Sequence, residues 1–144
     1  MSFIDIRGGL NEGQVFEKLN AEIKCQKENG VQYWPIFEKK NRDFVGCCGL
    51  KPWIHSSRGG LELGFHLIKE KWGKGFAKEA AQGAIGYAFR ELKVKLLMAG
   101  HHPKNENSKK ILLQLGFQFV EDIHFKPTGL NHASYEMKAS EYHL

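Results

Sequence analysis

Apolar residues recur along the chain with two different periods, which predicts a protein that combines helices and strands. Between positions 11 and 29 they return every three or four residues, which predicts an amphipathic helix that ends at Gly30. A long helix rich in small residues is predicted over 74–92, and a short one over 105–115. Runs of β-branched and aromatic residues predict strands at 33–37, 44–50, 61–68, 94–98, 117–125 and 133–137.

Turn residues join these strands into hairpins near both ends of the chain. Asn41, Arg42 and Asp43 separate the first two strands, and a Lys-Pro-Thr-Gly turn at 126–129 separates the last two. Pro35 favours an edge position or a bulge for the first strand, because proline cannot donate to a strand ladder. Helices alternate with strands only in the centre, so we predict a mixed α/β sheet.

Composition is that of one folded domain. The chain has 144 residues, of which 42% are hydrophobic and 26% charged, so neither disorder nor a second domain is indicated. The net charge of +5 suits a nucleic acid, an acidic surface or a polyanionic cofactor, and charge alone does not separate them. Because the chain has no aromatic-basic RNA motif and no recognition-helix pattern, we expect no nucleic-acid partner.

Cysteine usage and hydropathy indicate the compartment. Cys25, Cys47 and Cys48 cannot all pair, and a strand would send Cys47 and Cys48 to opposite faces, so no disulfide framework is expected. No apolar run approaches the roughly 18 residues of a membrane span, and the N-terminus lacks the apolar core of a signal peptide. We therefore expect a reduced, cytoplasmic protein with no membrane partner.

The glycine turn at Gly73-Lys74-Gly75 lies between a predicted strand and the long helix. Backbone amides in the first turn of a helix have no intrahelical partners, and the helix dipole adds positive charge, so this turn suits an anion. It does not match a Walker A loop, which would need glycine at Ile68 and Ser or Thr after Lys74. Nor does it match a Rossmann fingerprint, because Lys78 stands at the third glycine. A glycine-rich helix start without any ligand is the alternative.

Taken together, the segments around this turn resemble the GNAT superfamily of acyl-CoA-dependent N-acetyltransferases, and more closely its RimJ/RimL-like branch. They are the strand with Glu62 and His66, the turn WGKGFAKEA, the strand LLMAG, and Asn105-x-x-Ser108 leading to LLQLGF. The resemblance covers 37–119. It implies the GNAT fold, a central mixed and mostly antiparallel sheet of about six strands with flanking helices. It also implies transfer of an acetyl group from acetyl-CoA to a primary amine, by direct attack in a ternary complex.

The resemblance also implies where coenzyme A binds. In the superfamily the glycine turn follows the pattern Gln/Arg-x-x-Gly-x-Gly/Ala and holds the pyrophosphate; here both glycines match and Glu70 departs. Backbone groups of Leu67 and Ile68 would bind the pantetheine arm. Asn105 would bind it at the next helix, a role compatible with capping that helix. The amides around the phosphates would be those of Trp72, Gly73, Lys74, Gly75, Phe76 and Ala77, while Lys109 or Lys110 would approach the 3′-phosphate or simply remain solvated.

Catalysis by this route needs few groups. Glu62 is the candidate general base, directly or through a water, with a substrate-orienting or merely solvated glutamate as the alternative. Many family members place a tyrosine acid where this chain has Leu112, which leaves Ser108, a water or the amine itself to protonate the thiolate. His66 is expected to be structural. The pair His101-His102 would line the acceptor side or form polar surface, and without zinc-type spacing no metal is expected.

Relatives of this branch open with a further strand and helix, ahead of the segment that matches 11–29. We therefore expect a single domain over 1–144 that lacks them, with 3–6 replacing the strand, a partner subunit covering the edge, or altered activity. Exposed strand edges favour pairing, so a homodimer is predicted. The resemblance implies that the acceptor is an amine of a small molecule, a polyamine or a protein N-terminus. The alternative function is a coenzyme A-binding module with little or no catalysis.

Overall fold

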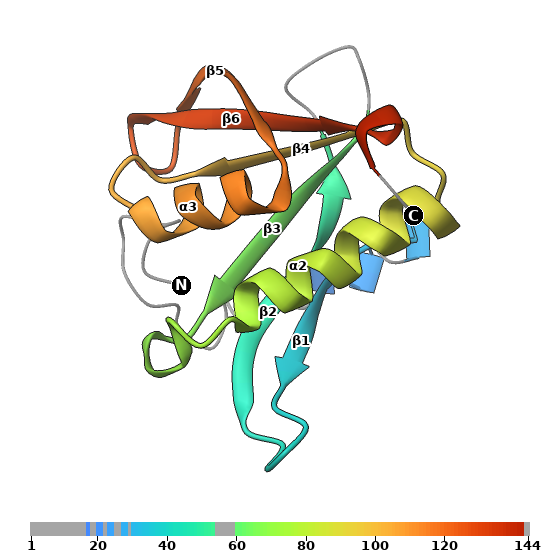
Figure 1. Cartoon of the computed structure of the whole chain (residues 1–144), viewed down its shortest axis with the longest axis vertical. Coiled ribbons are helices and arrows are strands. Elements are labelled where there is room, and N and C mark those ends of the chain that lie inside the picture. Colours follow the sequence, from blue (N-terminus) through green and yellow to red (C-terminus); the bar gives the residue numbers. More distant parts are fainter. Residues whose placement is uncertain are drawn as a thin grey trace.

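A computed structural model describes residues 17, 20, 21, 23, 24, 27, 28, 30–53 and 60–142. The described residues between 17 and 28 are helical, as the periodicity of that segment predicts. The strand considered at 3–6 and the side chain of Cys25 lie outside the described residues. Figure 1 shows the remainder as one twisted sheet with helices packed against it.

Within the described residues, six strands form a single mixed sheet in the order β1-β2-β3-β4-β6-β5. Neighbouring strands are antiparallel except for β3 and β4, which are parallel, so the predicted mixed and mostly antiparallel sheet is confirmed. The strands are β1 (Tyr33–Phe37), β2 (Phe44–Pro52), β3 (Leu61–Leu67), β4 (Leu96–His101), β5 (Gln118–Phe125) and β6 (Leu130–Lys138).

Both predicted hairpins are present, β1–β2 near the start and β5–β6 near the end. Pro35 lies in β1, an edge strand whose pairing with β2 shifts register between Ile36 and Phe37. The sheet therefore places the proline where the missing amide costs no ladder hydrogen bond. Cys47 is partly exposed and Cys48 is buried, as alternation along β2 predicts, and neither forms a disulfide.

The helices α2 (Phe76–Gly86) and α3 (Glu106–Leu115) cover the same face of the sheet (Figure 1). Small residues on α2 let it lie close to the strands, so Ala81, Ala84 and Ile85 share one buried cluster with Leu63 of β3. Leu112 of α3 belongs to the same cluster. Within the described part of the chain, no helix is long and apolar enough to cross a membrane.

Several predicted boundaries were wrong by a few residues. The long helix begins at Phe76 rather than 74, because Gly75 is its N-cap with a φ of 84°. It is also not uniformly α-helical to 92, since π-helical turns (η2, Tyr87–Glu91) follow Gly86. The next strand begins at Leu96, because Lys93 has a φ of 55° and the chain is still turning there. Both β2 and β6 extend beyond their predicted ends.

Candidate functional site

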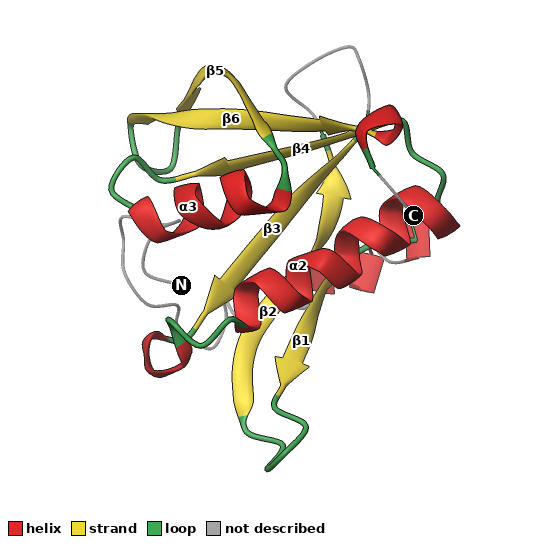
Figure 2. Cartoon of the chain, in the orientation of Figure 1, coloured by secondary structure: helices red, strands yellow, loops and turns green. Residues whose placement is uncertain are grey.

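The parallel strands β3 and β4 form a V that opens toward the glycine turn. They pair at only three positions, the last being Leu63 opposite Ala99, and beyond that pair they diverge (Figure 2). The N-terminal ends of α2 and α3 both lie at the open end of this V. The splay that the family resemblance implies is therefore present, and it separates a closed end at Leu63 from an open end flanked by two helix N-termini.

At the end of β3, Leu67 and the next residue, Ile68, differ in the direction of their backbone groups. The Ile68 amide donates to the Val45 carbonyl at 2.9 Å, and the Ile68 carbonyl accepts from the Lys71 amide at 3.0 Å. Because backbone groups alternate sides along a strand, those of Leu67 are directed away from β2, toward the splay. The Leu67 carbonyl accepts from the indole of Trp72 at 2.9 Å. Of the two residues expected to bind a pantetheine arm, only Leu67 is directed into the V.

The glycine turn is open to an anion. Gly73 and Gly75 have φ values of 74° and 84°, which favour glycine, and a Cβ at either position would meet nothing within 4 Å. Gly75 has no side chain to cap α2, so it supplies no hydrogen bond to the first-turn amides of Phe76 and Ala77. The Trp72 amide is already bonded to the Lys69 carbonyl at 3.1 Å. Because the Trp72 amide is engaged within the turn, the amides from Gly73 to Ala77 are the better candidates for donors to a phosphate.

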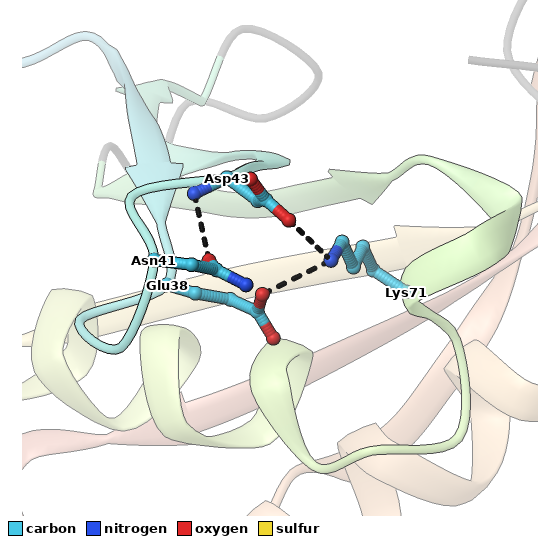
Figure 3. A network of polar contacts seen from close by, with 4 residues as sticks. All are labelled: Glu38, Asn41, Asp43 and Lys71. Atoms are coloured by element: carbon cyan, nitrogen blue, oxygen red, sulfur yellow. Dashed lines mark hydrogen bonds and ion pairs between the residues drawn. The ribbon is translucent and has the colours of Figure 1, made fainter.

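A polar network ties the start of this turn to the β1–β2 hairpin (Figure 3). Lys71 Nζ lies 3.0 Å from Glu38 Oε2 and 3.6 Å from Asp43 Oδ2. The Asp43 amide donates to Asn41 Oδ1 at 2.9 Å, which shapes the hairpin turn. The hydrogen bond between Lys71 and Glu38 raises the pKa of the lysine and lowers that of the glutamate. Both groups are therefore charged at neutral pH, and the chain just before the glycine turn is attached to the β1–β2 hairpin.

Glu62 lies at the closed end of the V, on the sheet face opposite the helices. Its side chain points to the face opposite that of Leu63, which is in the core below α2. Glu62 pairs with Lys51 of β2. Burial raises the pKa of the Glu62 carboxyl to about 6, against the opposing attraction of the Lys51 ammonium. Such a carboxyl is still mostly ionised at neutral pH, and it accepts a proton more readily than an exposed glutamate.

At the start of α3, Asn105 caps the helix. Its Oδ1 accepts from the Ser108 amide at 3.0 Å, as its type and position predict. Asn105 and Ser108 are half-buried, whereas Lys109 is exposed on the helix surface. Leu112, at the position of the family's tyrosine acid, is 1% exposed within the core. A proton donor at that position is therefore replaced by packing.

The structure connects the histidines at the end of β4 to Tyr135 of β6, a residue that the sequence did not single out. His101 Nδ1 donates to the His102 carbonyl at 2.8 Å, which leaves Nε2 to accept from the Tyr135 hydroxyl at 3.1 Å in the neutral ring. His102 and His132 are 5.2 Å apart between ring centroids, and burial lowers the pKa of both. The described residues contain no group of three or more acidic, histidine or cysteine side chains that could hold a metal.

A second missed residue, Tyr33, lies on the same face as Glu62. Its ring is 5.6 Å from that of His66, and Lys51 Nζ lies 4.5 Å from its centroid. No local pattern could have placed it there, because its position depends on the register of three strands.

Comparison with known proteins gives the same family at the level of sequence. A family model described as an acetyltransferase (GNAT) domain matches residues 5–118. The chain is 36% identical to the uncharacterized N-acetyltransferase p20 of Bacillus licheniformis, over 81% of this chain and 61% of the relative. It is 30% identical to the [ribosomal protein uS5]-alanine N-acetyltransferase of Escherichia coli (strain K12), over 70% of this chain and 52% of the relative. The chain thus spans between half and two thirds of these two curated relatives.

Solved structures show the same fold. The ribosomal-protein-S5-alanine acetyltransferase from Vibrio fischeri has a TM-score of 0.75 at 19% identity, covering 99% of this chain and 81% of that one. A variant of the spermidine N-acetyltransferase SpeG from Vibrio cholerae has a TM-score of 0.70 at 17% identity, covering 88% and 76%. At these identities the likeness concerns the fold alone.

Proposed function

The chain belongs to the GNAT acetyltransferase family, and we propose that it transfers an acetyl group from acetyl-CoA to a primary amine. One observation carries the proposal beyond family membership. The β3–β4 V has an open glycine turn at its wide end and a partly buried carboxylate, Glu62, at its closed end. An acetyl donor whose phosphates bind at the glycine turn and whose arm extends along β3 reaches Glu62.

The glycine turn and the edge of β3 would hold the acetyl donor. The amides from Gly73 to Ala77 face the pyrophosphate, Lys74 adds a positive charge, and Leu67 borders the arm. Asn105 and Lys109 approach the donor from the second helix N-terminus. When bound, the thioester supplies an acetyl group that is activated toward attack by nitrogen.

Glu62 would act as the general base. An amine attacks a carbonyl carbon only in its neutral form, so a proton must leave the acceptor nitrogen before or during attack. The Glu62 carboxylate at the closed end of the V accepts that proton, directly or through a water. Its raised pKa suits a group that must take up a proton and release it again at neutral pH.

Relatives indicate the range of acceptors. One is named as an alanine N-acetyltransferase of ribosomal protein uS5, and a fold neighbour as a spermidine N-acetyltransferase. We propose for this chain a primary amine from the same range, which includes protein N-termini, polyamines and small amines. Because Cys47 and Cys48 form no disulfide, a reducing compartment suits the chain, and we place the reaction in the cytoplasm. The edge strand β5, with Phe119 and Val120 exposed, would support a homodimer.

A coenzyme A-binding module without useful catalysis is the second candidate, and buried Leu112 favours it. Release of free thiol from acetyl-CoA, measured with a panel of amines that includes uS5-like N-terminal peptides and spermidine, tests the first candidate. We expect release that depends on one class of amine. Tight coenzyme A binding by calorimetry, with no amine-dependent release across the panel, would establish the second candidate instead.

A further inference from the structure

Tyr33 is held across the sheet by two glycines on neighbouring strands. It pairs with Gly49 of β2, and Gly49 pairs in turn with Gly64 of β3, so the three residues form one row across the face opposite the helices. A Cβ at Gly64 would overlap the hydroxyl and the adjoining ring atoms of Tyr33. Because neither glycine has a side chain, the ring extends over β2 and brings its hydroxyl onto β3.

Charged and polar groups flank the tyrosine ring. Lys51 Nζ lies over it at 4.5 Å from the centroid, and the His66 ring lies 5.6 Å away on the other side. Glu62 and His66 are the residues of β3 on either side of Gly64 that face the same way. The Tyr33 hydroxyl is therefore delivered between Glu62 and His66.

Gly64 also marks the point where the V begins to open. Leu63 is the last residue of β3 that pairs with β4, so Gly64 is the first to leave its neighbour. A donor that extends along the inner edge of β3 from the glycine turn meets paired strands at this point and can go no further. Its reactive end must then stop beside Gly64, next to the Tyr33 hydroxyl and close to Glu62.

We propose that the Tyr33 hydroxyl is the acid that protonates the departing sulfur, an assignment that rests on the proposed function. The acceptor nitrogen bonds to the acetyl carbon, and the carbon–sulfur bond breaks with its electron pair going to sulfur. The phenolic proton passes to that sulfur. Glu62 takes the proton lost by nitrogen, and a water relays it to the phenolate, so the site returns to its starting state and the products are an amide and a thiol.

The side chain suits this role chemically. A phenol with a pKa near the usual value of about 10 and an alkyl thiol with one of about 8.5 exchange a proton with little energetic cost. The family's position for an acid carries buried Leu112 here. Tyr33 comes from β1 rather than α3, and it reaches the opening of the V from the sheet face opposite α2 and α3.

Tyr33→Phe tests the assignment, because the ring that packs over both glycines remains. We expect kcat to fall on the order of 10²-fold with acetyl-CoA, while the affinity for coenzyme A stays within about twofold. With an aryl thioester, whose thiolate needs no proton to leave, the loss should shrink to about threefold or less. Tyr142→Phe, which removes a hydroxyl near the C-terminus, is the matched control and should behave as wild type with both donors.

A second readout needs no turnover. A hydroxyl that donates to the bound sulfur favours its thiolate, so Tyr33→Phe should raise the thiol pKa of bound coenzyme A by about one unit, followed by ultraviolet absorbance of the thiolate. Equal losses with both thioesters and an unchanged thiol pKa would overturn the assignment. If wild type itself binds coenzyme A without acetylating any amine, the proposed function fails; if it acetylates and Tyr33→Phe acetylates equally well, only the role of Tyr33 fails.

Discussion

At the scale of single residues, Glu62 shows how the site trades stability for reactivity. Its carboxyl is partly buried at the closed end of the V, and burial raises its pKa to about 6 despite Lys51 opposite. Desolvation disfavours the charged form, which is the form that a general base requires. The raised pKa therefore makes Glu62 a better proton acceptor, but it also means that the fold is less stable when Glu62 is ionised.

The first consequence concerns rate. The log of kcat should rise with pH and level off above about pH 6, because only ionised Glu62 accepts the proton. Glu62→Gln should lower kcat on the order of 10²-fold and remove this rise, with coenzyme A affinity unchanged. Glu91→Gln, an exposed glutamate beyond the end of α2, is the control. A Glu62→Gln enzyme that keeps the full rate and the same profile would exclude Glu62 as the base.

The second consequence concerns stability. The pKa of Glu62 in the folded protein, about 6, lies above the ordinary 4.5, so folding favours the protonated carboxyl. The resulting contribution to the free energy of unfolding is fully present below pH 4.5. As pH rises through the folded pKa, that contribution is lost, about 2 kcal/mol for a shift of this size. Relative to Glu62→Gln, wild type should therefore lose about 2 kcal/mol of unfolding free energy between about pH 4 and about pH 7. Urea titrations of both proteins measure it, and parallel pH curves would contradict it.

At the scale of elements, the glycine turn is attached to a hairpin from another part of the chain. Lys71 lies two residues before Gly73, and its ammonium contacts Glu38 and Asp43 on the β1–β2 connection (Figure 3). The lysine is 14% exposed and Glu38 17%, so the pair is better shielded from solvent than an ordinary surface ion pair. This attachment limits the positions that Gly73 and the start of α2 can take before a ligand binds.

Loss of this attachment should weaken binding of coenzyme A. Lys71→Met leaves the turn less ordered, so the ligand must order it, and we expect a roughly tenfold weaker Kd with kcat at saturating donor little changed. Lys69→Met, two residues earlier and exposed, is the matched control for loss of one positive charge. Exchange of the charges, Glu38→Lys with Lys71→Glu, should recover much of the affinity by calorimetry. Equal losses in the Lys69 and Lys71 variants would point to overall charge instead.

At the scale of the whole molecule, one sheet holds two helix N-termini at the mouth of a V. The β3 and β4 strands meet only as far as Leu63 and Ala99, and the core below them joins α2, α3 and the sheet. A ligand that touches the start of both helices would bridge parts of the protein that the divergent strands leave apart. Binding there should stabilise the folded state as a whole.

Coenzyme A should therefore raise the free energy of unfolding by about 2.7 kcal/mol at a hundredfold excess over its Kd. Pantetheine, which lacks the phosphates, should stabilise far less at the same concentration, because the glycine turn would stay empty. Thermal or chemical denaturation with each ligand measures this. In Gly75→Val, where the residue must hold a φ of 84°, the effect of coenzyme A should largely disappear. Equal stabilisation by both ligands would contradict phosphate binding at the turn.

Much of the fold follows from local sequence. Caps and turns depend on neighbours in the chain, so Asn105 as an N-cap, the helix end at 115 and both hairpins were predicted and are present. Boundaries failed where backbone conformation departs from the local pattern, as at Gly75 and Lys93 with their positive φ values. The glycine turn was recognised as a candidate anion site from its place between a strand and a helix, and the family resemblance implied its ligand.

The sequence by itself determined the order of the elements, because the periodicity of apolar residues encodes it, and its resemblance to GNAT acetyltransferases indicated the family that the matching family model shows. Only the tertiary structure decided that Tyr33 extends over Gly64, that Leu67 rather than Ile68 faces the V, and that Lys71 contacts Glu38. The first two depend on strand register, and the third joins residues that are 33 positions apart in the chain. Such pairings arise from packing of the whole sheet, and no local period specifies them.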